Sequence, residues 1–353
     1  MKKIGIIAEY NPFHAGHAYQ INSLRQMHPD AAIVVIMSGH FVQRGEPAIF
    51  DPYVRTETAL ENGADAVFMM PVSYSTASAE EFASCGIEML TKLGCEAVCF
   101  GIEGDAELEE LKNIAGLSAS SEKLKEYLRS GMSYPAAMSK AFGFNKLDGN
   151  NILAVEYLKA IERQKAPLEP IAIKRIGHGY NDSEFDEEYA SALAIRKVLL
   201  RDEADDAIGP DDLVPFLRSV IVRLNHEDAD FTQYLDVSEE IANRIRKEDF
   251  FRCTFEETVI ALKSKQYTYS RISRCLIHIL LDIKKHEPIA YQLLGFKKDS
   301  TEILKGLDII SKAADHKQET SQEAFASAVY SQIYEEKFKK SLPNFYSHSV
   351  IIK

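Results

Sequence analysis

The chain has 353 residues, of which 46% are hydrophobic and 27% charged, and its formal net charge is −12. These values are ordinary for a globular protein, exclude a disordered or collagen-like chain, and fit two domains or three. The negative charge excludes nucleic-acid binding by bulk attraction, so any such binding needs a local basic surface.

The sequence indicates neither membrane insertion nor export. The longest apolar runs, Ala31–Met37 and Ala66–Val72, are far shorter than the roughly 20 residues of a membrane helix. The apolar stretch that begins at Ile4 ends at Glu9, which is too short for the core of a signal peptide. We therefore expect a cytoplasmic protein with no membrane partner. Its five cysteines are expected to be buried side chains, and we expect no protein metal site.

The first 110 residues alternate strands and helices. Four short apolar runs bounded by turn residues predict strands at Ile4–Ala8, Ala32–Met37, Ala66–Met70 and Glu96–Phe100. Helical patterns lie between or after them at Gly16–Met27, Arg55–Asn62 and Ala79–Leu93. Because continuous apolar strands are buried on both faces, they predict a parallel sheet covered by helices.

The remainder of the chain is mainly helical. Residues 105–165 predict helices, Ile171–Ile176 a fifth strand and Tyr189–Leu200 the helix after it. Right-handed crossovers then give a doubly wound, Rossmann-like parallel sheet of five strands, with its ligand beyond the carboxyl ends of the strands. We expect a catalytic α/β domain over residues 1–200, a helical region over 201–285 and a small mixed region over 286–353.

The strongest local signal is the loop after the first strand, Glu9-Tyr10-Asn11-Pro12-Phe13-His14-Ala15-Gly16-His17, which opens a helix. Gly16 lets a ligand approach the backbone, and the first helical turn offers free N–H groups to a phosphate. His14 and His17 at that turn can donate to phosphate oxygens as charge develops on them. A histidine that only caps the helix is the alternative.

This strand–HxGH–helix arrangement resembles the nucleotidylyltransferase superfamily of the HIGH type, which binds ATP and runs adenylyl transfer at the α-phosphate. A second motif of that superfamily is similar to residues 191–197, in which Ser191 and Arg196 fit but Leu193 and Ala194 replace hydroxyl residues. Arg196 and Lys197 could still neutralise the leaving pyrophosphate. A solvated basic pair on an ordinary helix is the alternative.

Four further motifs follow in order, at Met37–Ala48, Gly131–Ala137, Gly149–Leu153 and Lys174–Ile176. With the HxGH loop they make the chain similar to the bacterial tRNA(Met) cytidine acetate ligase family over about the first 200 residues. The resemblance implies that acetate attacks the α-phosphate of ATP to give acetyl-adenylate. The N4 amine of the wobble cytidine of elongator tRNA(Met) then takes the acetyl group and becomes N4-acetylcytidine. Mg²⁺ is expected to arrive with ATP.

The resemblance also implies a set of ATP contacts. They are Ile7, Ala8, Glu9, Tyr10, Asn11, Pro12, Phe13, His14, Gly16, His17, Gln20, Gly101, Asn150, Asn151, Arg175 and Ile176. In the loop after the second strand, His40, Gln43, Arg44 and Glu46 form a polar group. Arg44 could hold acetate or a phosphate through two parallel hydrogen bonds, which adds it to His14, His17 and Arg196 as a catalytic candidate. A solvated surface loop is the alternative.

A tRNA substrate requires a cationic surface, and the window Thr258–Leu281 contains no acidic residue. Its candidates for tRNA binding are Lys263, Lys265, Tyr267, Tyr269, Arg271 and Arg274. Basic side chains reach phosphates and tyrosine can stack on an unpaired base. A solvated helix face is the alternative.

Two other functions stay open at this point. One is a small-metabolite adenylyltransferase of the same superfamily, against which the long basic helical region argues. The other is a non-catalytic nucleotide- or RNA-binding module, which the lost hydroxyls at Leu193 and Ala194 favour. No protein partner is implied.

Overall fold

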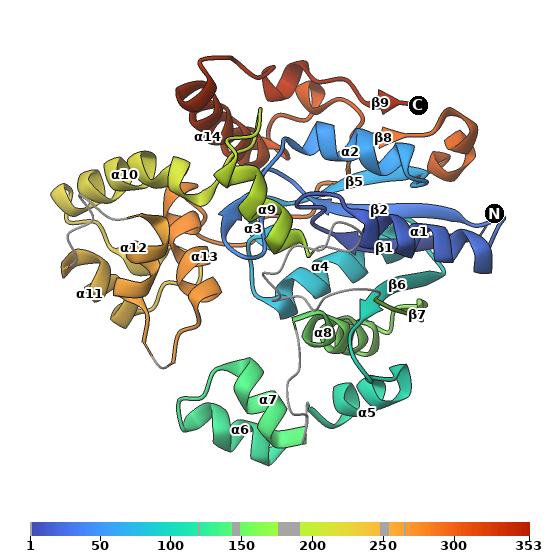
Figure 1. Ribbon diagram of the computed structural model, residues 1–353, viewed down its shortest axis with the longest axis horizontal. Helices are drawn as coiled ribbons and strands as arrows, with labels where there is room; N and C mark the ends of the chain where they lie inside the picture. Colours follow the sequence, from blue (N-terminus) through green and yellow to red (C-terminus); the bar gives the residue numbers. More distant parts are fainter. Residues whose placement is uncertain (1, 119–120, 143–148, 176–190, 248–253, 265) are drawn as a thin grey trace.

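The computed structural model describes residues 2–118, 121–142, 149–175, 191–247, 254–264 and 266–353. Its centre is a seven-stranded sheet with strand order β7-β6-β1-β2-β5-β8-β9 (Figure 1). The strands are β1 (Lys3–Ala8), β2 (Ala32–Ser38), β5 (Ala66–Met70), β6 (Ala97–Ile102), β7 (Glu169–Lys174), β8 (Gln292–Phe296) and β9 (Ile351–Ile352). A separate hairpin joins β3 (Phe41–Val42) to β4 (Glu46–Pro47).

The five predicted strands are all present and parallel, and they have the doubly wound order that the sequence predicts. The chain runs from β1 outward through β2 to β5 and then returns to β6 and β7 on the other side. The strand order therefore reverses between β1 and β6, which is where such sheets hold ligands.

The prediction of five strands in the sheet was too low by two. β8 pairs antiparallel with β5, and β9 pairs with β8, so residues 286–353 extend the central sheet. β8 begins with Gln292 and contains Gly295, and β9 has only two residues, so neither forms a long continuous apolar run like those of the other strands. The domain boundaries at residues 200 and 285 stay a prediction.

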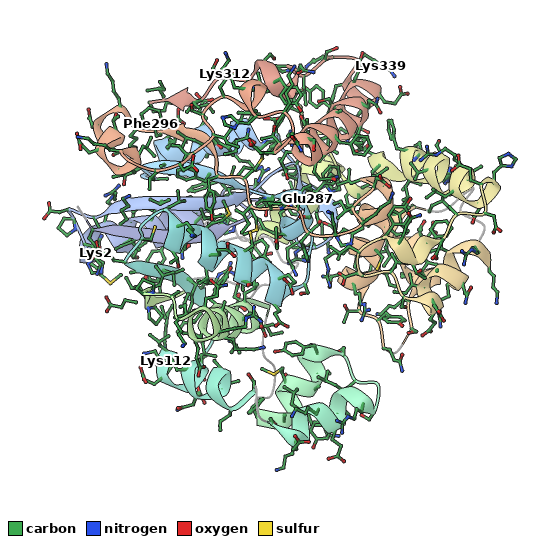
Figure 2. All side chains as sticks on the ribbon, turned by 180° about the vertical axis from the view of Figure 1, so that it is seen from behind. Lys2, Lys112, Glu287, Phe296, Lys312 and Lys339 are labelled. Carbon is green, nitrogen blue, oxygen red and sulfur yellow. The ribbon has the colours of Figure 1, made fainter. Side chains whose placement is uncertain are left out.

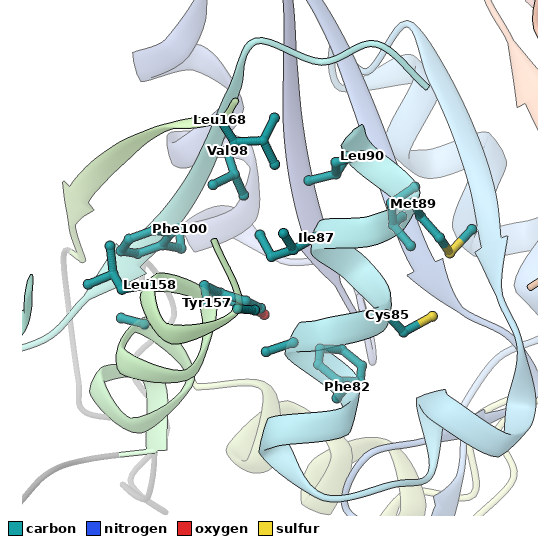
Figure 3. Close-up of a cluster of buried hydrophobic side chains, with 14 of the residues drawn as sticks. Phe82, Cys85, Ile87, Met89, Leu90, Val98, Phe100, Tyr157, Leu158 and Leu168 are labelled. Carbon is teal, nitrogen blue, oxygen red and sulfur yellow. The ribbon is translucent and has the colours of Figure 1, made fainter. Parts of the chain in front are cut away.

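Helices cover both faces of the sheet. One face packs against α1 (Ala15–Met27) and α2 (Pro52–Glu61), and the other against α4 (Ala79–Lys92) and α8 (Gly149–Gln164). Figure 3 shows the second face, where α4 and α8 bring Phe82, Ile87 and Tyr157 toward Val98 and Phe100 of β6. Alternate residues of each buried strand serve the two faces, as the pleat requires.

A helical region lies beside the sheet, and Figure 2 shows the same arrangement from behind. It contains α10 (Val214–His226), α11 (Glu239–Lys247), α12 (Phe255–Leu262) and α13 (Tyr269–Leu280), which share an apolar core with α14 (Ser321–Phe338). The other helices are α3 (Val72–Ser75), α5 (Leu108–Ser118), α6 (Glu122–Arg129), α7 (Tyr134–Phe142) and α9 (Ala192–Arg201). Short 3-10 helices lie at Pro210–Leu213, Phe231–Gln233, Lys298–Leu304, Ala313–Asp315 and Phe345–Ser347. In the described part of the chain, no helix combines the length and the apolar character needed to cross a membrane.

A buried arginine on α2 ties together the loops that follow the first two strands. Arg55 is 1% exposed, and its Nη1 donates to the carbonyl oxygens of Glu9 at 2.6 Å and Ser38 at 3.0 Å. Its Nη2 donates to the carbonyl of Gly39, and its Nε to that of Phe50 at 3.0 Å. Burial lowers the pKa of Arg55 to about 10, so the guanidinium stays charged at neutral pH.

We predict that Arg55→Met lowers the free energy of unfolding by about 3 kcal/mol or more, because it leaves several buried carbonyl oxygens without a donor. Urea denaturation measures this change. The matched control is Arg163→Met, which removes an exposed ion pair with Glu80 and should cost less than about 1 kcal/mol. Equal losses in the two variants would contradict the assignment.

Candidate active site

A pocket lies beyond the carboxyl ends of β1, β6 and β7, at the reversal of strand order. Its lining includes fourteen of the predicted residues: Ile7, Ala8, Glu9, Tyr10, Asn11, His14, Gly16, His17, Gln20, Arg44, Gly101, Asn150, Arg175 and Arg196. Pro12, Phe13 and Asn151 do not line it, and Ile176 lies outside the described residues. The structure thus gathers most of the predicted site residues, from six separate segments, around one cavity.

The two histidines of the HxGH motif form a capping box at the start of α1. The Nδ1 of His14 accepts from the backbone N–H of Gly16 at 3.1 Å, and the Nδ1 of His17 accepts from the backbone N–H of His14 at 3.3 Å. Their rings stack with centroids 3.8 Å apart. Because Nδ1 is an acceptor in both rings, the proton of each neutral imidazole must be on Nε2. The cap therefore fixes both histidines as Nε2–H donors.

The electrostatics of the site keep these histidines neutral. Burial lowers the pKa of His14, and with the nearby guanidinium groups of Arg175 and Arg196 it brings this pKa to about 4. Burial, together with His14 and Arg175, also holds the pKa of His17 well below its ordinary value. At neutral pH the pair thus offers hydrogen-bond donors without positive charge, while the arginines supply the charge.

Aromatic rings support the second histidine from the side. Tyr10 is fully buried, and its ring lies edge-on to Phe13 at 4.9 Å and to His17 at 4.8 Å between centroids. Phe13 itself lies 5.5 Å from the His17 ring. Phe13, which the resemblance placed among the nucleotide contacts, is therefore positioned to orient His17 from outside the pocket.

The motif at residues 191–197 contacts the HxGH loop through a hydrogen bond of Arg196. The side chain of Arg196 on α9 is buried, and its Nη1 donates to the carbonyl oxygen of Asn11 at 2.6 Å. Ser191 caps α9 by accepting from the backbone N–H of Ala194 at 3.1 Å. Leu193 lines the pocket where the motif has a hydroxyl residue, whereas Ala194 is buried and does not line it. Two helix N-termini, those of α1 and α9, thus converge on the cavity.

The polar loop after β2 divides between the pocket and the interior. Gln43 and Arg44 line the pocket, and the backbone N–H of Gln43 donates to Glu9 Oε1 at 2.8 Å. His40 is instead buried, with its Nε2 3.6 Å from a carboxylate oxygen of Asp51. His40 therefore does not share the rim with Arg44 as its place in the sequence suggested.

An acidic residue that the sequence interpretation missed organises the far end of the pocket. Glu103 follows β6, and its Oε1 accepts from Arg175 Nη1 at 3.0 Å and from Asn150 Nδ2. Asn151 turns away from the pocket, since its Oδ1 accepts from the backbone N–H of Glu103 at 3.0 Å. Gly101 leaves room for Arg175, because a Cβ there would lie 3.1 Å from the arginine Cγ and the side chain would have to shift slightly. The only sequence signal for Glu103 is an acid directly after a buried strand.

The pocket also has an apolar wall that the sequence did not reveal. It consists of Phe82, Phe100, Leu153 and Tyr157, from α4, β6 and α8. Phe82, Phe100 and Tyr157 belong to the hydrophobic core of that face of the sheet (Figure 3). Leu153 packs against this core. Periodicity marks such residues as core, and it cannot tell which core residues also border a cavity.

The residues predicted to bind tRNA lie outside the pocket, around the start of α13. Lys263 is exposed, and the guanidinium of Arg271 lies 4.8 Å from the centre of the Tyr267 ring. Arg274 is instead buried, with its Nε 3.8 Å from a carboxylate oxygen of Asp236. Arg274 thus lies within the helical region and not on its surface.

The two remaining tRNA candidates are Tyr269 and Lys265. Tyr269 is half-buried, and burial followed by the nearby Glu46 carboxylate raises its pKa. Because Glu46 belongs to the β3–β4 hairpin, this places Tyr269 beside the loop that carries Arg44. Lys265 lies outside the described residues.

Comparisons with known proteins agree with this architecture. The family model described as HIGH Nucleotidyl Transferase matches residues 1–344. A tRNA(Met) cytidine acetate ligase from Thermoanaerobacter sp. (strain X514) is 34% identical, over 94% of this chain and 95% of its own. The tRNA(Met) cytidine acetate ligase from Caldicellulosiruptor saccharolyticus is 35% identical, over 100% of this chain and 99% of its own.

Solved structures share the fold. The crystal structure of Thermotoga maritima TmcAL in its apo form superposes with a TM-score of 0.87 at 24% identity, covering 100% of this chain and 99% of that one. The structure of the same protein bound with alpha-thio ATP gives a TM-score of 0.84 over the same shares of both chains. The likeness therefore extends over the sheet and the helical region together.

We predict that the two neutral histidines make the protein less stable in mild acid. Below pH about 6.5 the unfolded chain takes up protons on these residues that the native protein refuses, so the free energy of unfolding falls as the pH drops toward 4. Each histidine contributes up to about 1.4 kcal/mol per pH unit in this window. Urea denaturation between pH 7 and 4.5 should give a flatter pH dependence for His14→Asn, which keeps a capping side chain but binds no proton. An unchanged slope would contradict a depressed pKa at His14.

Proposed function

The chain belongs to the HIGH nucleotidyl transferase family and, within it, to the tRNA(Met) cytidine acetate ligases, and from this premise we propose its reaction. It activates acetate with ATP, giving acetyl-adenylate and pyrophosphate. It then transfers the acetyl group to the N4 amine of the wobble cytidine of elongator tRNA(Met). A tRNA substrate places this reaction in the cytoplasm.

The observation that carries the proposal is the histidine pair fixed as Nε2–H donors at the start of α1. When an acetate oxygen attacks the α-phosphorus, a P–O bond forms to acetate and the bond to pyrophosphate breaks. Negative charge builds on the phosphate oxygens, and donors already oriented toward it stabilise the transition state without reorganisation. His14 and His17 line the pocket in this donor state, and acetate itself is the nucleophile, so no residue need form a covalent intermediate.

Arginines on either side of the histidines supply the charge that the neutral pair lacks. Arg196 neutralises the leaving pyrophosphate from the second turn of α9, whose N-terminal end adds a favourable helix dipole. Arg44, at the rim beside Gln43, is the proposed partner of the acetate carboxylate, since its planar guanidinium matches two carboxylate oxygens.

We also propose that Mg²⁺ enters with the triphosphate. In the described parts of the chain, no group of three or more His, Cys, Asp or Glu side chains is arranged to hold a metal ion. In the proposed reaction the Mg²⁺ is held mainly by phosphate oxygens and by water, as it commonly is in nucleotide sites. The ion neutralises phosphate charge when bound.

In the second step the cytidine N4 nitrogen attacks the acetyl carbonyl carbon. A C–N bond forms, the C–O bond to AMP breaks, and the N4 proton leaves to solvent. The surface proposed to hold the tRNA is the start of α13 with the turn before it, where the exposed Lys263 lies near the half-buried Arg271, whose guanidinium lies over the Tyr267 ring. Tyr269 lies between this surface and the β3–β4 hairpin. We leave the buried Arg274 out of the surface.

The proposal is tested by incubating the protein with ATP and labelled acetate, with and without tRNA(Met). We expect pyrophosphate release that requires acetate, and label in the RNA only when tRNA is present. Label in the RNA from acetyl-CoA without ATP would overturn the ligase reaction. Adenylyl transfer to a small acceptor without labelled RNA would indicate a metabolite adenylyltransferase. Nucleotide binding with no pyrophosphate would indicate a non-catalytic module.

We predict that His17→Ala lowers the rate of acetate-dependent ATP–pyrophosphate exchange by about 10²–10³, because it removes one donor to the developing charge. The control is His28→Ala at the other end of the same helix, which should retain the exchange rate. Circular dichroism establishes that both variants fold. Full exchange by a folded His17→Ala protein would refute the role of the histidine pair.

We predict that Lys263→Glu combined with Arg271→Glu separates the two steps. Exchange with acetate should be unchanged, whereas acetyl transfer to tRNA should fall and tRNA binding should become less salt-dependent as phosphate contacts are lost. The matched charge reversal is Lys305→Glu combined with Lys312→Glu, at exposed lysines of the C-terminal region. If the two double variants bind tRNA equally across a salt series, the RNA surface lies elsewhere.

A further inference from the structure

Glu103 occupies the centre of a hydrogen-bonded group at the β6–β7 end of the pocket. It is 6% exposed and does not line the cavity, yet its Oε1 accepts from two residues that do, Asn150 and Arg175. Its backbone is fixed in turn by Asn151, whose amide accepts from the Glu103 N–H at 3.0 Å and donates to the Glu103 carbonyl at 3.2 Å. Asn151 thus fixes the backbone of Glu103, and the Glu103 carboxylate in turn binds two residues of the pocket lining.

This arrangement settles which way the amide of Asn150 points. A side-chain amide has one end that donates and one that accepts, and the two ends have nearly the same shape. An ionised carboxylate only accepts, so it selects the orientation in which the Asn150 Nδ2 faces Glu103. The carbonyl Oδ1 of Asn150 then remains as the group that can accept a hydrogen bond from a ligand.

We propose that Glu103 is a positioning residue that sets the nucleoside preference of the site. It fixes Asn150 so that the Oδ1 accepts a hydrogen bond from a donor on the nucleoside, and it anchors Arg175 beside that donor. Two donors of adenosine fit this chemistry, the exocyclic amine of the base and a ribose hydroxyl. The amine would distinguish adenine from guanine, which carries a carbonyl oxygen at the same ring position and would meet the Oδ1 acceptor to acceptor.

The inference rests on the proposed use of ATP, and it adds which residues make the site prefer ATP over other nucleotides. Loss of a single neutral hydrogen bond typically costs about tenfold in affinity, and a mismatch of two acceptors costs more because neither finds a partner. The readout is therefore a ratio of affinities between nucleotides. A merely structural role of Glu103 would weaken all nucleotides alike and leave that ratio unchanged.

The experiment is isothermal titration of the full chain, without acetate or tRNA, with four nucleotides: ATP, GTP, purine riboside triphosphate, which lacks the amine, and 2′-deoxy-ATP. The unaltered protein should bind ATP at least about tenfold more tightly than the analogue that lacks the contacted donor. Weakened binding of purine riboside triphosphate would identify the amine as that donor, and weakened binding of 2′-deoxy-ATP would identify the ribose hydroxyl. Equal affinity for all four would overturn the inference.

Glu103→Gln then tests the mechanism, because glutamine can donate as well as accept and so permits both orientations of Asn150. ATP affinity should fall about tenfold, and the preference for ATP over the analogue should shrink toward unity. The control Glu109→Gln, which removes an exposed ion pair with Lys112, should keep the preference. Retention of the full preference in a folded Glu103→Gln protein would overturn the inference.

A second variant keeps the test decisive if Glu103→Gln does not fold. Asn150→Ala removes the acceptor itself and should abolish the preference with Glu103 in place. In the double variant the losses should not add, since both changes remove the same contact. Additive losses would show that Glu103 acts independently of Asn150. Nucleotide binding is measured without acetate or tRNA. A failure of acetyl transfer would therefore refute the proposed reaction, whereas the measured nucleotide preference would still test the role of Glu103.

Discussion

The active-site end of the sheet depends on one buried cation. The carbonyl oxygens of Glu9, Ser38 and Gly39 lie at the carboxyl ends of two parallel strands, β1 and β2, where the regular pairing of the sheet stops. Arg55 reaches all three from α2 and donates to each. An unpaired buried carbonyl is costly, so these loops have little freedom once the guanidinium is in place. The Glu9 side chain then holds Gln43, which fixes the loop that carries Arg44.

Each histidine of the HxGH pair has both a structural role and a proposed role in binding phosphate. A capping histidine and a phosphate-binding histidine are alternatives only if each ring has a single use, and an imidazole has two nitrogens. In His14 and His17 one nitrogen satisfies the start of α1, and the other is left as an N–H donor. The cap also opposes protonation, because an imidazolium has no lone pair with which to accept a backbone N–H. Helix geometry therefore sets the protonation state that the chemistry of phosphate requires.

The sequence predicted those features that local pattern determines. Five strands, four of them buried, and the HxGH turn are visible because apolar runs and a strand-to-helix loop are local, and the structure confirms them. Arg55 and Glu103 could not be found in this way, since a buried charge and an exposed one look alike in a sequence. For the same reason the sequence placed His40 at the pocket rim, although it is buried beside Asp51. It also placed Arg274 among the surface candidates, although Arg274 pairs with Asp236 inside the helical region.

The helical region is joined to the pocket through close backbone contact. Gly45 has a φ of +78°, and a Cβ there would lie 2.4 Å from the backbone nitrogen of Arg274, so the β3–β4 hairpin rests directly on α13. Deeper along α13, the ring nitrogens of His278 lie 2.8 Å from the Leu235 carbonyl oxygen and 3.0 Å from that of Thr76. These contacts tie the helix that begins at the proposed RNA surface to the loop that carries Arg44. A cytidine held on the proposed surface would therefore have a fixed position relative to the loop that carries Arg44, which is the kind of orientation that a transfer without a covalent carrier depends on.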